Sequence, residues 1–116
     1  MDNEFVIGKN ASDNVRLIQE SQSLSPLDVW FHLNNYSSAH LIFHNIQNKN
    51  MNRLRKDGTI YKMASILKKH MTSKLHHTTH QSHVEIIYSY VKDIKLVKPT
   101  GTVRLLSKSK DYIINV

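Results

Sequence analysis

Cysteine is absent from this sequence of 116 residues, which excludes a disulfide framework and any metal site with thiolate ligands and fits a reducing compartment. No apolar run approaches the ~20 residues that span a bilayer. The first residues have neither the basic start nor the apolar run of a secretion signal. We therefore expect a cytoplasmic protein whose length suits one domain with a single core.

The short motifs of common catalytic sites are missing as well. The sequence contains no glycine-rich phosphate loop, no GxSxG motif and no HExxH motif. No close pair of carboxylates offers a basis for acid–base chemistry. These absences predict that the protein is not an enzyme and uses no cofactor.

Histidine, by contrast, is frequent, with eight in the chain. His40 and His44 have the i, i+4 spacing with which two imidazoles can chelate a divalent metal. A second group of histidines consists of His76, His77, His80 and His83. Because this group contains no cysteine and no carboxylate, we predict that its histidines donate to phosphate and form no metal site.

Acidic residues are scarce in the second part of the chain. Residues 1–48 contain two basic and five acidic residues, whereas residues 49–116 contain fourteen basic and four acidic residues. A polyanion is the natural partner of such a surface, because neutralising phosphates releases condensed counterions. The alternative is a solvated basic surface that only aids solubility.

Two helices are predicted in the basic part of the chain. The first extends from Thr59 to about Lys74, and the second from Thr79 to Val97. In both, apolar residues recur with the spacing of one helix face, which predicts that this face is buried. The residues are Ile60, Met63, Ala64, Leu67 and Met71 in the first, and Val84, Ile87, Tyr88, Val91 and Ile94 in the second.

The remaining segments give weaker patterns. A helix is predicted from Leu27 to Tyr36, after the start signal Ser25-Pro26. We favour another from Leu41 to about Asn52, although this apolar run is also compatible with a buried strand. Short β-prone runs lie at residues 5–7 and 15–18, which allow a small hairpin or a partly flexible arm, and at residues 102–106 and 112–116.

The span from about Gly58 to Val116 resembles the winged helix-turn-helix fold of bacterial, plasmid and phage DNA-binding proteins. The resemblance rests on two amphipathic helices joined by a short turn and followed by two β-prone runs around a basic loop. The quoted segments are Ile60 to Leu67, Gln81 to Val84 with Tyr90 to Ile94, Lys95 to Lys98, Gly101 to Arg104, and Asp111 to Asn115.

This resemblance implies an α+β fold that is mainly helical and carries a C-terminal β-hairpin wing. Residues 1–24 would form an N-terminal arm or hairpin, and residues 25–116 a winged helix-turn-helix domain with additional N-terminal helices. The recognition helix, at about residues 79–96, would enter the major groove. The wing, residues 98–116, would lie on the adjacent backbone or minor groove.

The resemblance also implies which residues contact DNA. The N-terminal polar residues of the recognition helix would contact base edges. Basic residues of the loop before the first helix, the end of the recognition helix and the wing would contact phosphate. The base contacts would be His80, Gln81, Ser82, Glu85 and Ser89, and the phosphate or wing contacts Arg53, Arg55, Lys56, Lys92, Lys98, Arg104, Lys108 and Lys110.

The function predicted from this reasoning is sequence-specific binding of double-stranded DNA by a transcriptional regulator or an origin- or partition-site binder. Apolar residues between Pro26 and Asn52 would complete the core and support a homodimer that reads paired half-sites. The alternative is a winged-helix protein-interaction module, because fold alone does not decide between the two. RNA binding is disfavoured, since the sequence shows no aromatic-studded sheet motif.

Overall fold

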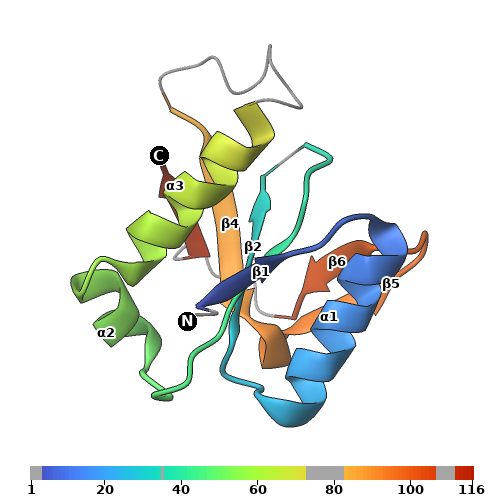
Figure 1. The fold of residues 1–116 in the computed structure, drawn as a ribbon, viewed down its shortest axis with the longest axis horizontal. Helices are drawn as coiled ribbons and strands as arrows, with labels where there is room; N and C mark the ends of the chain where they lie inside the picture. Colours follow the sequence, from blue (N-terminus) through green and yellow to red (C-terminus); the bar gives the residue numbers. More distant parts are fainter. Residues whose placement is uncertain (1–3, 35, 73–82, 107–111) are drawn as a thin grey trace.

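A five-stranded antiparallel sheet forms the centre of the computed structural model, which describes residues 4–34, 36–72, 83–106 and 112–116 (Figure 1). The strand order is β1-β3-β2-β4-β7, and each neighbouring pair is antiparallel. The strands are β1 (Phe5–Ile7), β2 (Val29–Leu33), β3 (Leu41–Phe43), β4 (Glu85–Tyr90) and β7 (Ile113–Asn115).

Strand β2 lies in the middle of this sheet and is covered on both faces. Its successive side chains point to opposite sides, as the pleat of a strand requires. Val29, Phe31 and Leu33 belong to one apolar cluster, and Trp30 belongs to the other. Trp30 lies opposite Ile42 of β3 and Ser89 of β4. This strand therefore separates two layers of core.

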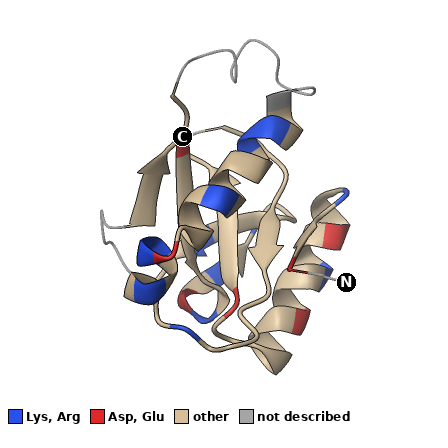
Figure 2. Ribbon diagram, turned by 60° about the vertical axis from the view of Figure 1, so that its left-hand side comes forward, with Lys and Arg blue, Asp and Glu red and all other residues tan. Residues whose placement is uncertain are grey.

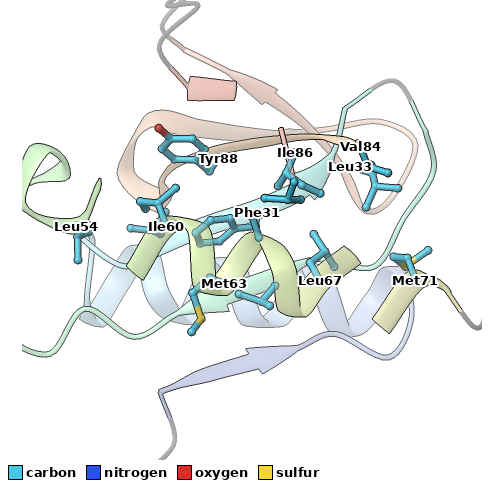
Figure 3. Close-up of a cluster of buried hydrophobic side chains, with 14 of the residues drawn as sticks. Phe31, Leu33, Leu54, Ile60, Met63, Leu67, Met71, Val84, Ile86 and Tyr88 are labelled. Carbon is cyan, nitrogen blue, oxygen red and sulfur yellow. The ribbon is translucent and has the colours of Figure 1, made fainter. Parts of the chain in front are cut away.

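Helix α3 (Thr59–Thr72) covers the first face. Ile60, Met63 and Leu67 are at most 1% exposed, and Figure 3 shows them on the side of the helix that faces Phe31 and Ile86. Helix α2 (Met51–Lys56) precedes α3 and adds Met51 and Leu54 to the same cluster. The larger core of the protein therefore lies between α3 and the sheet.

Helix α1 (Ala11–Leu24) covers the opposite face together with a second, two-stranded sheet. That sheet pairs β5 (Ile94–Val97) with β6 (Thr102–Leu105), and a 3-10 turn, η1 (Val91–Asp93), connects it to β4. Leu17 and Ile18 of α1 pack with Trp30, Val91 and Ile94 in a smaller cluster. Figure 1 shows α1 beside β5 and β6.

The predicted fold class is wrong. A winged helix-turn-helix is mainly helical, whereas the described residues combine a five-stranded sheet and a two-stranded sheet with three α-helices. The predicted wing does not form either. The residues that should pair within it belong to different sheets, because β6 pairs with β5 and β7 pairs with β4.

The segments predicted as helices at 27–36 and 79–97 contain strands instead. Residues 29–33 form β2, and residues 85–97 form β4, η1 and β5. In the run predicted as a helix from Leu41, residues 41–43 form β3, which agrees with the buried-strand alternative. A strand that is buried on both faces loses the alternation of apolar and polar residues, so its apolar residues also match a helical spacing.

Other predictions are confirmed. The helix predicted from Thr59 to about Lys74 is α3, and the runs at 102–106 and 112–116 contain β6 and β7. In the N-terminal segment, residues 5–7 form β1, but residues 15–18 lie within α1 and not in a hairpin. Asn10 caps α1 by accepting a hydrogen bond from the amide of Asp13 at 2.8 Å.

Candidate nucleic-acid interface

The residues predicted to contact bases do not share a helix. Glu85 is exposed at the start of β4, and its carboxylate accepts a hydrogen bond from the Asn34 amide at 3.0 Å. Ser89 is 2% exposed, and its hydroxyl donates to the carbonyl of Tyr90 at 3.1 Å. Its burial leaves Ser89 no access to a base edge. His80, Gln81 and Ser82 lie outside the described residues.

Three of the predicted phosphate contacts lie on α2. Arg53 and Lys56 are exposed. Arg55 is half-buried: its Nε donates to the hydroxyl of Tyr88 at 2.8 Å, and its guanidinium lies 5.7 Å from the Tyr88 ring centroid and 5.8 Å from that of Tyr112. Arg55 is therefore held against the sheet, whereas Arg53 and Lys56 face solvent.

Further predicted phosphate contacts lie on the opposite side of the molecule or at its edge. Lys92 lies 3.2 Å from the carboxylate of Asp93. Arg104 of β6 is exposed and lies opposite exposed Lys95 of β5. Lys98 is exposed just beyond the end of β5. Lys108 and Lys110 lie outside the described residues.

Helix α3 adds cations that were not among the predicted phosphate contacts. Lys62 and Lys69 are exposed on its outer side, and α3 contains no acidic residue. Lys62 is 3.4 Å from Glu4, with both side chains at least half exposed. Lys68 instead donates to the carbonyl of Val116 at 2.9 Å. The absence of acids from a lysine-rich helix is the sequence signal that identifies this surface.

We call Arg53, Lys56, Lys62 and Lys69 the basic face. Among the described residues, no carboxylate lies within ion-pair distance of Arg53, Lys56 or Lys69. Figure 2 shows basic residues along α2 and α3, whereas the acidic residues of α1 lie on the other side. Phosphate can therefore approach Arg53, Lys56 and Lys69 without displacing a carboxylate of the described residues, whereas Lys62 already pairs with Glu4.

A hollow of about 530 Å³ lies where the start of α1, the end of α3 and the tip of the β5–β6 hairpin meet. Gly101, at the hairpin tip, approaches α1 closely, since a Cβ there would lie 3.0 Å from the Cβ of Ala11. None of the described residues that line the hollow is acidic. Its aromatic lining residues are Trp30, His32, His40 and His70.

His40 is a neutral hydrogen-bond donor in this hollow. The indole Nε1 of Trp30 donates to Nδ1 of His40 at 3.0 Å, and an indole N–H can only donate. Nδ1 is therefore the acceptor, so the proton of the neutral ring is on Nε2. Burial, with a smaller effect of His32, lowers the pKa of His40 to about 4. The ring thus stays neutral at physiological pH.

His32 has the complementary tautomer. Its Nδ1 lies 2.6 Å from the carbonyl of Leu33, which can only accept, so Nδ1 carries the proton and Nε2 is an acceptor. Burial lowers the pKa of His32 against a smaller opposite effect of that hydrogen bond. The His32 and His40 ring centroids are 4.8 Å apart, and His32 stacks on Trp30 at 5.6 Å. An acceptor and a donor therefore lie on neighbouring neutral rings.

The two histidines predicted to form a chelating pair point to different partners. His40 bonds to Trp30, whereas Nδ1 of His44 lies 3.3 Å from the carboxylate of Asp28. Their spacing would bring them together on a helix, but β3 separates them. The described segments contain no group of three or more potential metal ligands. His76 and His77 lie outside those segments.

Comparisons with known proteins give the fold alone. No family model matches the chain, and no curated protein matches it. Among solved structures, it is similar to the C-terminal part of the fibronectin/fibrinogen-binding protein (FBPS) from Streptococcus suis, with a TM-score of 0.64 and 16% sequence identity. The match covers 97% of this chain but 39% of that chain. In the segments that the structure describes, no helix has both the length and the apolar composition needed to cross a membrane.

Proposed function

We propose that the protein binds nucleic acid, with double-stranded DNA as its partner, through phosphate contacts of the basic face. The observation that carries this proposal is that Arg53, Lys56 and Lys69 have no carboxylate partner among the described residues. Arg16 of α1 differs, because Asp13 and Glu20 lie 2.7 and 3.1 Å from its guanidinium. Cations without carboxylate partners are the ones that gain most from phosphate.

The proposed contact is with the backbone of the duplex. Each phosphate that a cation neutralises releases counterions, so affinity falls steeply as salt rises. Contacts of this type fix the protein on the duplex but carry no sequence information. Because β4 replaces the predicted recognition helix, we do not propose that a helix of residues 79–96 reads the major groove. The predicted homodimer and the predicted role in regulation or replication stay predictions.

The test compares two triple variants with equal loss of charge. Arg53→Gln/Lys56→Gln/Lys69→Gln removes three cations of the basic face. The control, Arg16→Gln/Lys95→Gln/Arg104→Gln, removes three exposed cations from α1 and the β5–β6 hairpin. Binding of a fluorescent duplex of about 20 base pairs is measured by anisotropy between about 50 and 200 mM salt.

We expect the basic-face variant to bind about tenfold more weakly or worse, and its salt slope to fall by about 0.9 for each lost phosphate contact. The control should retain most of the affinity. Equal losses in the two variants would contradict this assignment. Absence of salt-dependent binding by the parent would overturn the DNA proposal and favour the protein-interaction alternative. A single strand of the same length that binds as tightly would show that the duplex is not the preferred partner.

A further inference from the structure

The hollow between α1 and α3 combines a neutral aromatic wall with a positive rim, and its lining is distinct from the basic face. We propose that it binds a nucleoside phosphate, with the base against His32 and His40 and the phosphate at the start of α1. A free mononucleotide and an unpaired nucleotide at the end of a nucleic-acid strand share this chemistry. The proposal uses none of the basic-face residues, so it can fail or succeed independently of the proposed function.

The wall formed by His32 and His40 suits a nucleobase because it offers both hydrogen-bonding roles. His40 is 4% exposed and its Nδ1 is occupied by Trp30, so Nε2–H is the ring group left for a ligand. His32 has Nδ1 on the carbonyl of Leu33, so its Nε2 is left as an acceptor. The edge of a base carries acceptors and donors close together, whereas an isolated phosphate carries acceptors only. Aromatic side chains also contact the flat face of any base.

The start of α1 suits a phosphate. The side chain of Asn10 accepts from the amide of Asp13, so the amides of Ala11 and Ser12 are left without an intrahelical acceptor. The aligned peptide dipoles of a helix of fourteen residues make this end positive. Lys9 adds a full charge, since it lines the hollow and its side chain is exposed.

Asp13, the acidic residue nearest the start of α1, does not prevent a phosphate from binding there. Asp13 belongs to the first turn of α1 but does not line the hollow. Its carboxylate accepts from the amide of Lys9 at 2.9 Å and is 2.7 Å from the guanidinium of Arg16. Its carboxylate is therefore held by two donors, the backbone N–H of Lys9, which lines the hollow, and the guanidinium of Arg16, which does not.

A buried hydrogen-bond acceptor without a partner also belongs to the lining of the hollow, and it suits a donor of the ligand, such as a ribose hydroxyl, rather than a phosphate oxygen. Asn14 lines the hollow and is 6% exposed, and its Oδ1 has no hydrogen-bond partner among the described residues. Buried polar atoms are rarely left unsatisfied, so each exception requires a reason. Gly8 leaves room for this amide, since a Cβ at residue 8 would clash with Oδ1. The volume of about 530 Å³ is also within the range of small-molecule sites.

The test is a calorimetric titration of the full chain with adenosine monophosphate, adenosine and inorganic phosphate. We expect the monophosphate to bind about tenfold more tightly than either part, because it uses both the wall and the rim. Lys9→Gln should weaken the monophosphate about three- to tenfold and leave adenosine unchanged, whereas His32→Phe should weaken both ligands by a similar factor. Lys95→Gln, which removes an exposed lysine away from the hollow, is the matched control for Lys9→Gln.

Three further measurements test where the ligand binds and what its source is. Amide NMR shifts during the titration should move at residues 8–14 and at His40, and the basic-face triple variant should still bind the monophosphate. A duplex with an unpaired, 5′-phosphorylated end that displaces the monophosphate, when a blunt unphosphorylated duplex does not, would identify a strand end as the source. Failure of both duplexes to displace it would identify a free nucleotide. The proposal is overturned if the monophosphate does not saturate the parent protein, or if Lys9→Gln and His32→Phe bind it as the parent does.

Discussion

Helices α1 and α3 have the same length, fourteen residues, and cover opposite faces of one sheet, yet their outer surfaces differ. On α1, Arg16 lies between Asp13 and Glu20 and forms ion pairs with both. On α3, Lys62 and Lys69 occupy the outer side of a helix without acidic residues. Lys62 pairs with Glu4, whereas Lys69 has no carboxylate partner among the described residues. Helix α1 thus neutralises Arg16 with its own acidic residues, and α3 leaves Lys69 for a partner.

The buried sides of the two helices also differ, because they pack into clusters of different size. Ile60, Met63 and Leu67 of α3 belong to the larger cluster, whereas Leu17 and Ile18 of α1 belong to the smaller one. Helix α3 therefore carries its exposed lysines on a helix whose opposite side is packed into the larger core.

The largest expected effect tests this difference in anchoring. Leu67→Ala removes a fully buried side chain from the larger cluster, and Leu17→Ala removes one that is 8% exposed from the smaller cluster. We expect losses in the free energy of unfolding of about 4 and about 2.5 kcal/mol, respectively. Urea unfolding followed by circular dichroism measures both. A larger loss for Leu17→Ala would contradict the proposed difference between the helices.

A second prediction concerns His40, which lies where the two helices meet around the hollow. Its pKa is lowered from 6.5 to about 4 in the folded protein, so the unfolded chain binds a proton first as pH falls. The stabilisation is complete above the unfolded value of 6.5 and is lost as pH falls towards 4, by on the order of 3 kcal/mol. Urea midpoints measured by the fluorescence of Trp30 should show this decline. His40→Gln should flatten it, and an unchanged profile would show that His40 titrates normally.

The side chains that accept hydrogen bonds at the starts of the two helices also differ, and the expected effect on stability is smaller. Asn10 caps α1, whereas Asp57 accepts from the amide of Thr59, the first residue of α3, at 3.0 Å. Replacing Asn10, or Asp57 in the turn before α3, by alanine should cost about 1 kcal/mol near neutral pH. Hydrogen bonds from Thr59, then from Lys49, lower the pKa of Asp57 to about 2. The cost of Asp57→Ala should therefore be full above about pH 4 and vanish as pH falls through about 2.

Asn10 does not titrate, so the cost of Asn10→Ala should not depend on pH. Thermal unfolding of the two variants across this range measures both costs. A cost of Asp57→Ala that persists at the lowest pH would contradict the role of its ionised carboxylate.

The smallest expected effect is that of the ion pairs on α1. Arg16 is 56% exposed, and exposed ion pairs contribute little to stability. We expect Arg16→Gln to leave both the urea midpoint of unfolding and the DNA affinity nearly unchanged. Chemical denaturation and duplex anisotropy measure the two quantities. A marked loss of affinity would show that α1 also contacts DNA.

Helix α3 could be predicted from sequence because one side of it is buried and the other is exposed. The apolar spacing of Ile60, Met63 and Leu67 then has one interpretation. Strands β2 and β4 were mistaken for helices because both of their faces are covered, which removes the alternation that marks a strand. In β4, Ile86 joins the larger cluster and Ile87 packs on the smaller one, so adjacent isoleucines serve opposite faces.

The candidate sites were predictable to different degrees. Exposed cations such as Arg53 and Lys56 could be found because charge needs no tertiary structure to be recognised. The hollow could not, because it depends on contacts between distant segments, such as Gly101 against Ala11. The pairing of Trp30 with His40 likewise depends on the register of β2 and β3. Interpreting residues 29–33 as a strand would have placed Trp30 and His32 on one face.

The most direct test gives α3 the charge pattern of α1. Ser65 lies three residues after Lys62 and four before Lys69, so Ser65→Glu places a carboxylate within reach of both lysines. Ser65→Gln is the neutral control, and Gln19→Glu adds the same charge to exposed α1. In duplex anisotropy at about 100 mM salt, we expect about tenfold weaker binding for Ser65→Glu and parental binding for both controls. Equal affinities for Ser65→Glu and Gln19→Glu would contradict the claim that the basic face on α2 and α3 holds the nucleic acid.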